Sequence, residues 1–513
     1  MIRLIHWILG VALLVAGAFD VSAFALLGQF KGAGTVAGEP WQDDGFDGRP
    51  QGLGYSLAGD IGGPMFAHEA YRWNIPTITY AYDSSFLRFF GTNGVSAVEE
   101  AMAILNALPP ASQMSLTLDE FPLDSKRENA GAGAIGLVDL KSHALTLMVE
   151  EIGLANPERF VFGLRSRQAG QFFTNYAVIQ MNYDPVTIAP SRYVNGVLYN
   201  YVIFDALGPQ GGEWASAIEW YQLDPLRLPY SSVAGGFGNP DLTLGASPDL
   251  SGGFTGIQGL LNGQYFTGLT RDDVGGIRYL LSPNNKVFET LLPTVVPASV
   301  VGGGSPWSPV FGTNVVGATN VVVTNLLGTN VLANFTRTAL RGGVDKLTFQ
   351  RVNFDSILGT TFTPITNRYT DFFINPTNGR IVRQRVARAI LRPDIIFALN
   401  DLDTSFEVPF FAFRTDTSGW SNNAAINTAI VGGNNLGGPG TITPGIVIGF
   451  SDLLPFFLNV PGGLDSDFPV PVTWGSFDAS DRPPVVYPIF QHPLLPELSL
   501  EYLQSLATRR RNR

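Results

Sequence analysis

The sequence predicts an α+β N-terminal domain followed by a β-rich, sandwich-like C-terminal domain. Charged residues make up only 15% of the 513 positions, while Gly (58), Pro (35) and Phe (36) are abundant. This composition favours strands joined by long ordered loops. The segments with clear helical spacing of apolar residues lie before residue 282. Beyond that point the patterns are those of strands and turns, so the two parts of the chain are expected to differ in class.

Residues 1–25 have the layout of a secretory signal peptide. Arg3 gives a positive start, residues 4–19 are almost wholly apolar, and Ala23-Phe24-Ala25 is a small-x-small cleavage signal. The apolar run is shorter than the roughly 20 residues of a membrane span, so no span is expected after leader removal; a retained N-terminal anchor is the alternative. We expect a secreted or periplasmic, cell-envelope protein, and the lack of cysteine favours a bacterial exterior.

The α+β domain is assigned to residues 26–282. Residues 77–82 alternate β-branched and aromatic side chains, which predicts a strand. A helix is expected over residues 96–108, where Ser96 and Glu99 have the spacing of a capping box. A second helix is expected over residues 139–152, ended by Gly153.

Further along this domain, Asn195-Gly196 between two short apolar pairs predicts a type I′ hairpin turn. A third helix is expected over residues 270–281, with Thr270 and Asp273 capping its start.

The remaining chain divides into a Pro/Gly-rich linker at 283–312, a β-rich domain at 313–500 and a basic tail at 501–513. Thr-Asn-aliphatic triplets begin at Thr313, Thr319, Thr324 and Thr329. They are typical either of a small β-solenoid or of a drifting low-complexity linker. Residues 369–374 and 380–391, joined by a turn at 375–379, predict a long hairpin.

Residue types that carry catalysis or bind metals are sparse. His68-Glu69 begins like a His-Glu-x-x-His zinc motif, but Arg72 stands where the second histidine belongs. Around Ser56 the glycines are one residue too far apart for a hydrolase elbow. We therefore assign no catalytic, metal or cofactor-binding residue and expect no cofactor.

The carboxylates of the sequence leave open two kinds of site, calcium binding and glycoside hydrolysis. Asp43, Asp44 and Asp47 beside glycines, and Asp401-x-Asp403-x-Ser405, are incomplete calcium patterns, and in both cases the sequence favours an ordinary turn. Glu150-Glu151 is interpreted as a solvated helix face. A pair of distant carboxylates could still form a glycosidase-type site, because sequence carries no distances.

The densest internal basic run occupies the second strand of the predicted hairpin. Alternation along a strand puts Arg383 and Arg385 on one face and Arg380, Arg388 and Arg392 on the other. This split favours a solvated strand over a polysaccharide-binding face. The net charge of −11 argues against nucleic acid as a partner.

Two segments resemble matrixin-type metalloproteases of the metzincin group. Residues 78–82 followed by the helix at Ser96 resemble that family's opening strand and helix, and residues 269–280 (LTRDDVGGIRYL) resemble its closing helix. The family's zinc motif, His-Glu-x-x-His-x-x-Gly-x-x-His, is absent. The resemblance implies a metzincin-like scaffold without its metal and transfers no catalytic residue.

Together these observations predict an exported, non-catalytic structural or adhesive protein of the bacterial envelope or extracellular space. Its expected partners are envelope polymers, polysaccharide or a second copy of itself. The alternative is a secreted hydrolase, protease-like or glycosidase, with a site assembled from dispersed residues.

Overall fold

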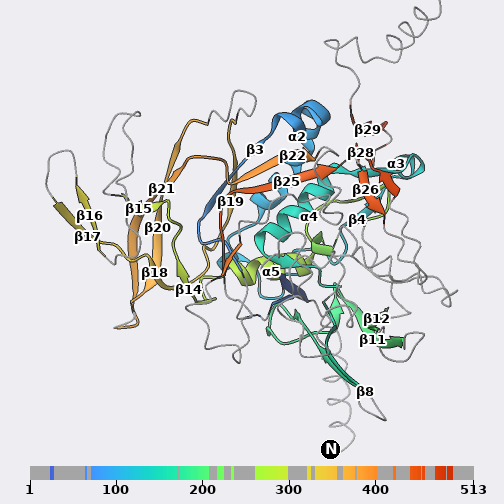
Figure 1. The fold of residues 1–513 in the computed structure, drawn as a ribbon, viewed down its shortest axis with the longest axis horizontal. Helices are drawn as coiled ribbons and strands as arrows, with labels where there is room; N and C mark the ends of the chain where they lie inside the picture. Colours follow the sequence, from blue (N-terminus) through green and yellow to red (C-terminus); the bar gives the residue numbers. More distant parts are fainter. Residues whose placement is uncertain are drawn as a thin grey trace, which may run out of the picture.

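The computed structural model describes residues 23–27, 64, 65, 67, 71–158, 160–169, 174–206, 216–223, 233–235, 260–298, 320–324, 330–354, 362–375, 378–400, 420–422, 440–451, 453–456, 468–480 and 482–488. Among the helices of these residues, none has both the length and the apolarity needed to cross a membrane. The fold is mixed α/β and rich in strands (Figure 1).

A four-stranded parallel sheet lies at the centre of the molecule. Its order is β19 (Thr348–Arg351), β3 (Thr77–Tyr82), β22 (Ile395–Asn400) and β25 (Ile446–Ser451). All three pairings are parallel. Strand β3 has the predicted bounds, and its Ile78, Tyr80 and Tyr82 side chains, which share one face of the strand, are buried.

Helix α2 (Ser84–Ala107) packs on this sheet and against α4 (Leu140–Ile152). It begins twelve residues before the predicted start, because Asp83 caps it by accepting a hydrogen bond from the Ser85 N–H. Gly91 breaks the helical dihedrals inside α2 with φ of 60°, which hides the first turns from a periodicity search. Helix α4 matches its prediction, and Gly153 ends it in the left-handed conformation.

Helix α5 (Arg271–Leu281) also matches its prediction, with Thr270 and Asp273 forming the capping box. Beneath it lies a small antiparallel sheet that contains the end of the predicted leader. Ala23 and the first three residues of β1 (Phe24–Leu27) are buried, and the Ala23 N–H donates to Asp272 Oδ1 at 2.9 Å. A leader ending at residue 25 would remove half of this strand, so the predicted boundary conflicts with β1, while the signal peptide itself stays a prediction.

The other small elements of the front half surround these helices. They are β1 (Phe24–Leu27), β2 (Pro64–Met65), β4 (Lys126–Glu128), α3 (Ala130–Ala134), β5 (Leu137–Asp139), β6 (Leu154–Ala155), β7 (Gly163–Ala169), β8 (Thr174–Ile179), β9 (Asn182–Tyr183), β10 (Tyr193–Val194), β11 (Val197–Ala206), β12 (Ser216–Leu223) and β13 (Gln264–Phe266), with 3₁₀ turns at Ala111–Gln113 and Val233–Gly235. The turn between β10 and β11 has positive φ at both Asn195 and Gly196, which confirms the predicted type I′ hairpin.

A five-stranded antiparallel sheet stands to one side of the parallel sheet (Figure 1). Its order is β14 (Val287–Thr290), β18 (Thr338–Arg341), β20 (Ile365–Ile374), β21 (Ile381–Ile390) and β15 (Val295–Pro297). The predicted long hairpin is confirmed as β20–β21, paired in continuous register from Ile374↔Ile381 to Ile365↔Ile390. Strands β14 and β15 belong to residues 283–298, so this part of the predicted linker is ordered sheet.

Smaller strand pairs complete the back half. They are β16 (Asn320–Thr324) with β17 (Asn330–Asn334), β23 (Trp420–Asn422) with β24 (Gly440–Ile442), β26 (Leu453–Phe456) with β27 (Phe468–Pro471), and β28 (Thr473–Ser476) with β29 (Val485–Val486). The described parts of the Thr-Asn triplets lie in β16 and β17, which pair antiparallel, while residues 313–319 and 325–329 lie outside the described residues.

The two sides of the predicted linker share one sheet and one core. Strand β3 hydrogen-bonds with β19 and β22, and β5 pairs with β28, each partner lying beyond residue 312. One cluster of buried side chains includes Phe86 and Phe90 of α2 together with Phe397, Phe450 and Trp474. The domain bounds drawn from composition are therefore crossed by hydrogen bonds and by packing.

Candidate binding surface

The five-stranded sheet carries different chemistry on its two faces. Residues two apart along a strand share a face, and residues paired across strands do too. On the inward face lie Glu289, Arg341, Asp371 and Arg388, all buried. The outward face is the side that bears Phe288, Phe372 and Arg383, all exposed. We call this side the outer face.

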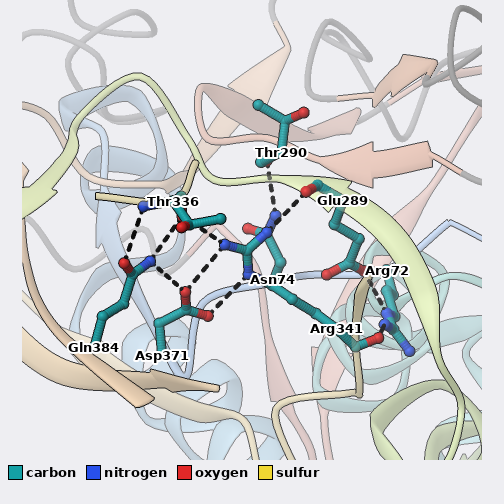
Figure 2. Close-up of polar contacts among 8 residues, drawn as sticks. All are labelled: Arg72, Asn74, Glu289, Thr290, Thr336, Arg341, Asp371 and Gln384. Carbon is teal, nitrogen blue, oxygen red and sulfur yellow. Dashed lines mark hydrogen bonds and ion pairs between the residues drawn. The ribbon is translucent and has the colours of Figure 1, made fainter. Parts of the chain in front are cut away.

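The inward face holds a network of charged side chains (Figure 2). Arg341 on β18 donates two hydrogen bonds to the Asp371 carboxylate on β20, from Nε to Oδ1 at 2.9 Å and from a terminal nitrogen to Oδ2 at 3.0 Å. Gln384 on β21 donates to the same carboxylate at 2.8 Å and to the Thr336 carbonyl at 2.7 Å, and it accepts from the Thr336 N–H. Three neighbouring strands are thus joined through side chains as well as through backbone.

A second ion pair connects this sheet to the rest of the molecule. Arg72 Nε lies 2.5 Å from Glu289 Oε1, and its terminal nitrogens donate to the carbonyls of Leu280, Asn285 and Arg341. Burial raises the pKa of Glu289, and attraction to the Arg72 guanidinium opposes that rise. Asn74 adds a hydrogen bond to the Thr290 carbonyl at 3.0 Å, as Figure 2 shows.

A third pair joins β21 to the central parallel sheet. Arg388 pairs with the fully buried Asp394, which also accepts from the backbone N–H and the hydroxyl of Thr79 on β3, at 2.7 and 2.9 Å. Two of the three ion pairs, Arg72–Glu289 and Arg388–Asp394, therefore fasten the five-stranded sheet to the body of the molecule through buried polar contacts.

The outer face begins with an apolar row across four strands. Phe288 pairs with Leu340, Leu340 with Ile374, and Ile374 with Ile381. Phe288 is 44% exposed and Ile381 is 71% exposed. Strand spacing makes this row about 14 Å wide.

Beside the apolar row lies a group of arginines around an aromatic ring. Phe372, 57% exposed, sits directly opposite Arg383, and Thr370 sits opposite Arg385. Arg368 occupies the same face two positions further along β20. In the five strands as described, every charged side chain on the outer face is one of these three arginines.

The predicted split of the basic run is confirmed for Arg383 and Arg385 against Arg388, but the expected solvated strand is contradicted at Arg388, which is buried. Arg383 and Arg385 are exposed on the outer face, whereas Arg388 points the other way and is buried in its ion pair. Arg380 and Arg392 lie at the two ends of β21 and are exposed. Sequence reasoning missed Arg368 and Phe372 as neighbours of this run, although the alternation of β20 could have indicated them once the hairpin register was known.

The other sequence candidates take structural roles or lie outside the described residues. Glu151 is buried, which contradicts its interpretation as a solvated helix position: α4 lies inside the core, and the Glu151 carbonyl accepts from Trp73 Nε1 at 2.7 Å. The segments outside the description are those at Asp43–Asp47, Ser56, His68-Glu69 and Asp401–Ser405. Among the described residues, no group of three or more metal-ligating side chains is found.

Polar side chains near the central helices also act structurally. Asp139 is the N-cap of α4, and the Ser142 hydroxyl donates to Asp139 Oδ2 at 2.5 Å and accepts from the Phe266 N–H, which links the start of α4 to β13. His143 packs against Phe450 and Trp474, and burial lowers its pKa well below the usual value.

On the other side of α2, Tyr80 and Tyr82 both donate to the Glu99 carboxylate, at 2.7 and 3.0 Å. Burial raises the pKa of both phenols, with Glu99 adding to the effect, so they remain protonated donors.

Comparison of the chain with models of known protein families, with curated proteins and with solved structures found no significant match. The functional interpretation therefore rests on the geometry of the molecule itself.

Proposed function

We propose that this chain is an exported, non-catalytic structural or adhesive protein of a bacterial envelope or extracellular space, and that it acts through the outer face of the five-stranded sheet. The single observation that carries this proposal is the contrast between the two faces. Inward charges are paired within the protein, while Arg383, Arg385 and the rings of Phe288 and Phe372 are exposed on the outer face. Exposed apolar side chains grouped with cations are typical of surfaces that meet a partner.

The ion pairs of the inward face support this proposal because they fix the position of the strands that form the outer face. A binding face gives affinity when its side chains are already in place before the partner arrives. The pair Arg341–Asp371 joins β18 to β20, and the pairs Arg72–Glu289 and Arg388–Asp394 hold the sheet against the body of the molecule, which keeps the outer face in one shape.

Two finer points of the fold also belong among the proposals. We infer a metzincin-like front half; its support is α5, where Asp273 accepts from Thr270, Val233 and Ala234 and so ties the helix start to a distant turn. We further infer sandwich-like packing among the C-terminal strands, supported by their abundance and alternating burial.

The test of the proposed function uses the purified full chain. Retention on immobilised peptidoglycan and polysaccharides, together with self-association measured by sedimentation, is expected to reveal binding at micromolar concentration. Casein and a polysaccharide panel, incubated with and without chelator, are expected to stay intact. Cleavage of any of them at a catalytic rate would favour the hydrolase alternative, and no association of any kind would contradict the proposal.

A further inference from the structure

We propose that the outer face of the five-stranded sheet binds an acidic polysaccharide, in which Arg383 and Arg385 pair with sugar carboxylates and Phe372 stacks on a sugar ring. This inference rests on the proposed function, since it names the surface and the ligand class for that binding role.

Charge complementarity is the first support. The chain carries a net charge of −11, yet Arg383 and Arg385 are exposed on the outer face, and no carboxylate of the five described strands lies on that face. The nearest carboxylate of β20, Asp371, points to the opposite side and is neutralised by Arg341. The face is therefore a cationic area on an acidic protein, and it attracts anions that the remaining surface repels.

The spacing of these side chains is the second support. Arg383 and Arg385 are two positions apart on one strand, so their Cα atoms are about 6.7 Å apart. Phe372 is paired with Arg383 across the hairpin, which brings the two Cβ atoms to about 5 Å. An aromatic ring thus lies beside two guanidinium groups that can each bind a carboxylate through two parallel hydrogen bonds.

The alternation of apolar and charged groups matches the pattern of an acidic glycan. Here the arginines lie next to the exposed ring, and the row from Phe288 to Ile381 continues the apolar contact area along the sheet. A polymer of uronic acids presents the matching pattern, since each unit has a ring face of C–H groups and a carboxylate at its edge.

The experiment measures affinity of the full chain for polygalacturonate, with dextran as the neutral probe and dextran sulfate as a polyanion whose charge is not a carboxylate. The chain is expected to bind polygalacturonate, to bind dextran sulfate more weakly than polygalacturonate, and not to bind dextran. Arg383→Ala combined with Arg385→Ala is expected to lower the affinity about tenfold or more, and Phe372→Ala severalfold. The control is Arg127→Ala, an exposed arginine on β4, which is expected to bind like the parent.

Circular dichroism and thermal unfolding of each variant verify that binding is compared between folded proteins. Unchanged polygalacturonate binding in the double variant would overturn this inference. Preferential binding to phosphatidylglycerol vesicles, or self-association that disappears in Phe372→Ala, would also overturn it and assign the face to a lipid surface or to a second copy. Binding to peptidoglycan or dextran that the double variant retains would leave the proposed function standing while this inference fails; binding to none of the probes would contradict both.

Discussion

Neighbouring residues of β21 differ in their surroundings because successive side chains of a strand point to opposite faces of the sheet. Arg383 and Arg385 are exposed, Gln384 between them bonds to Asp371 and Thr336, and Arg388 is buried against Asp394. The alternation itself was predictable from sequence. The partners were not, because the residues that neutralise Arg341 and Arg72 lie 30 and 217 positions away.

Removing one charge from the inward-facing network is expected to lower the free energy of unfolding substantially. Asp371→Asn leaves the buried Arg341 guanidinium without its counter-charge, and loss of one partner of a buried pair costs about 3–5 kcal/mol. Arg383→Ala, twelve positions along the same hairpin but exposed, is expected to change stability by less than about 0.5 kcal/mol. Urea unfolding of both variants measures the difference, and equal midpoints would show that the network does not stabilise the sheet.

Asp139, the N-cap of α4, makes stability depend on pH. Its full burial is the largest effect and raises the pKa of the carboxyl to about 6, although Lys141 and Ser142 oppose the rise. A raised pKa in the folded state favours the protonated form. This contribution to stability is therefore fully present below about pH 4 and is lost as the pH rises through 6.

Asp139→Asn keeps an N-capping side chain but cannot ionise. Between pH 4 and pH 7.5 the wild-type free energy of unfolding is expected to fall relative to that of the variant by roughly 2–3 kcal/mol. Chemical unfolding of both proteins across this range gives the difference directly. A difference that stays constant with pH would mean that the Asp139 pKa is not raised.

At the scale of elements, local signals were the most reliable. The capping box of α5, the Gly153 end of α4 and the β20–β21 hairpin each depend on residues close together in the chain, and each was predicted. The start of α2 was missed because Gly91 interrupts its periodicity. The β14 and β15 strands were mistaken for linker since their partners are distant in sequence.

The end of α4 requires glycine for two separable reasons. Gly153 has φ of +117°, and a Cβ there would lie 2.5 Å from the Tyr71 carbonyl oxygen. Gly379 also has positive φ, +66°, but open space around it. Gly379→Ala is expected to cost roughly 1–2 kcal/mol from backbone strain, and Gly153→Ala about 1–3 kcal/mol more from the clash. Thermal unfolding of the two variants compares them, and a milder effect at Gly153 would be inconsistent with the close approach of Tyr71.

For the whole molecule, the sequence indicated the mixed, strand-rich composition but not the central parallel sheet. Parallel neighbours are joined by long connections, so no local turn signal marks them. Strand β3 pairs with residues more than 260 positions away, and short apolar strands such as β22 give no sign of their partner.

A consequence is that the front half depends on the back half. A fragment ending at residue 298 would lack β19, β22 and β25 and would expose Ile78, Tyr80 and Phe86. It is expected to lack the near-ultraviolet circular dichroism of the full chain and to aggregate. A soluble fragment with a cooperative unfolding transition would instead show that the predicted N-terminal domain folds independently.

We propose that one sheet stabilises the molecule with its inner face and binds a ligand with its outer face. An alanine scan of Arg383, Gln384 and Arg385 tests this, with the free energy of unfolding and the affinity for polygalacturonate recorded for each variant. We expect Gln384→Ala to lose about 1–3 kcal/mol of stability and to keep its affinity, and we expect Arg383→Ala and Arg385→Ala to lose affinity and to keep their stability. The same response at all three positions would contradict it.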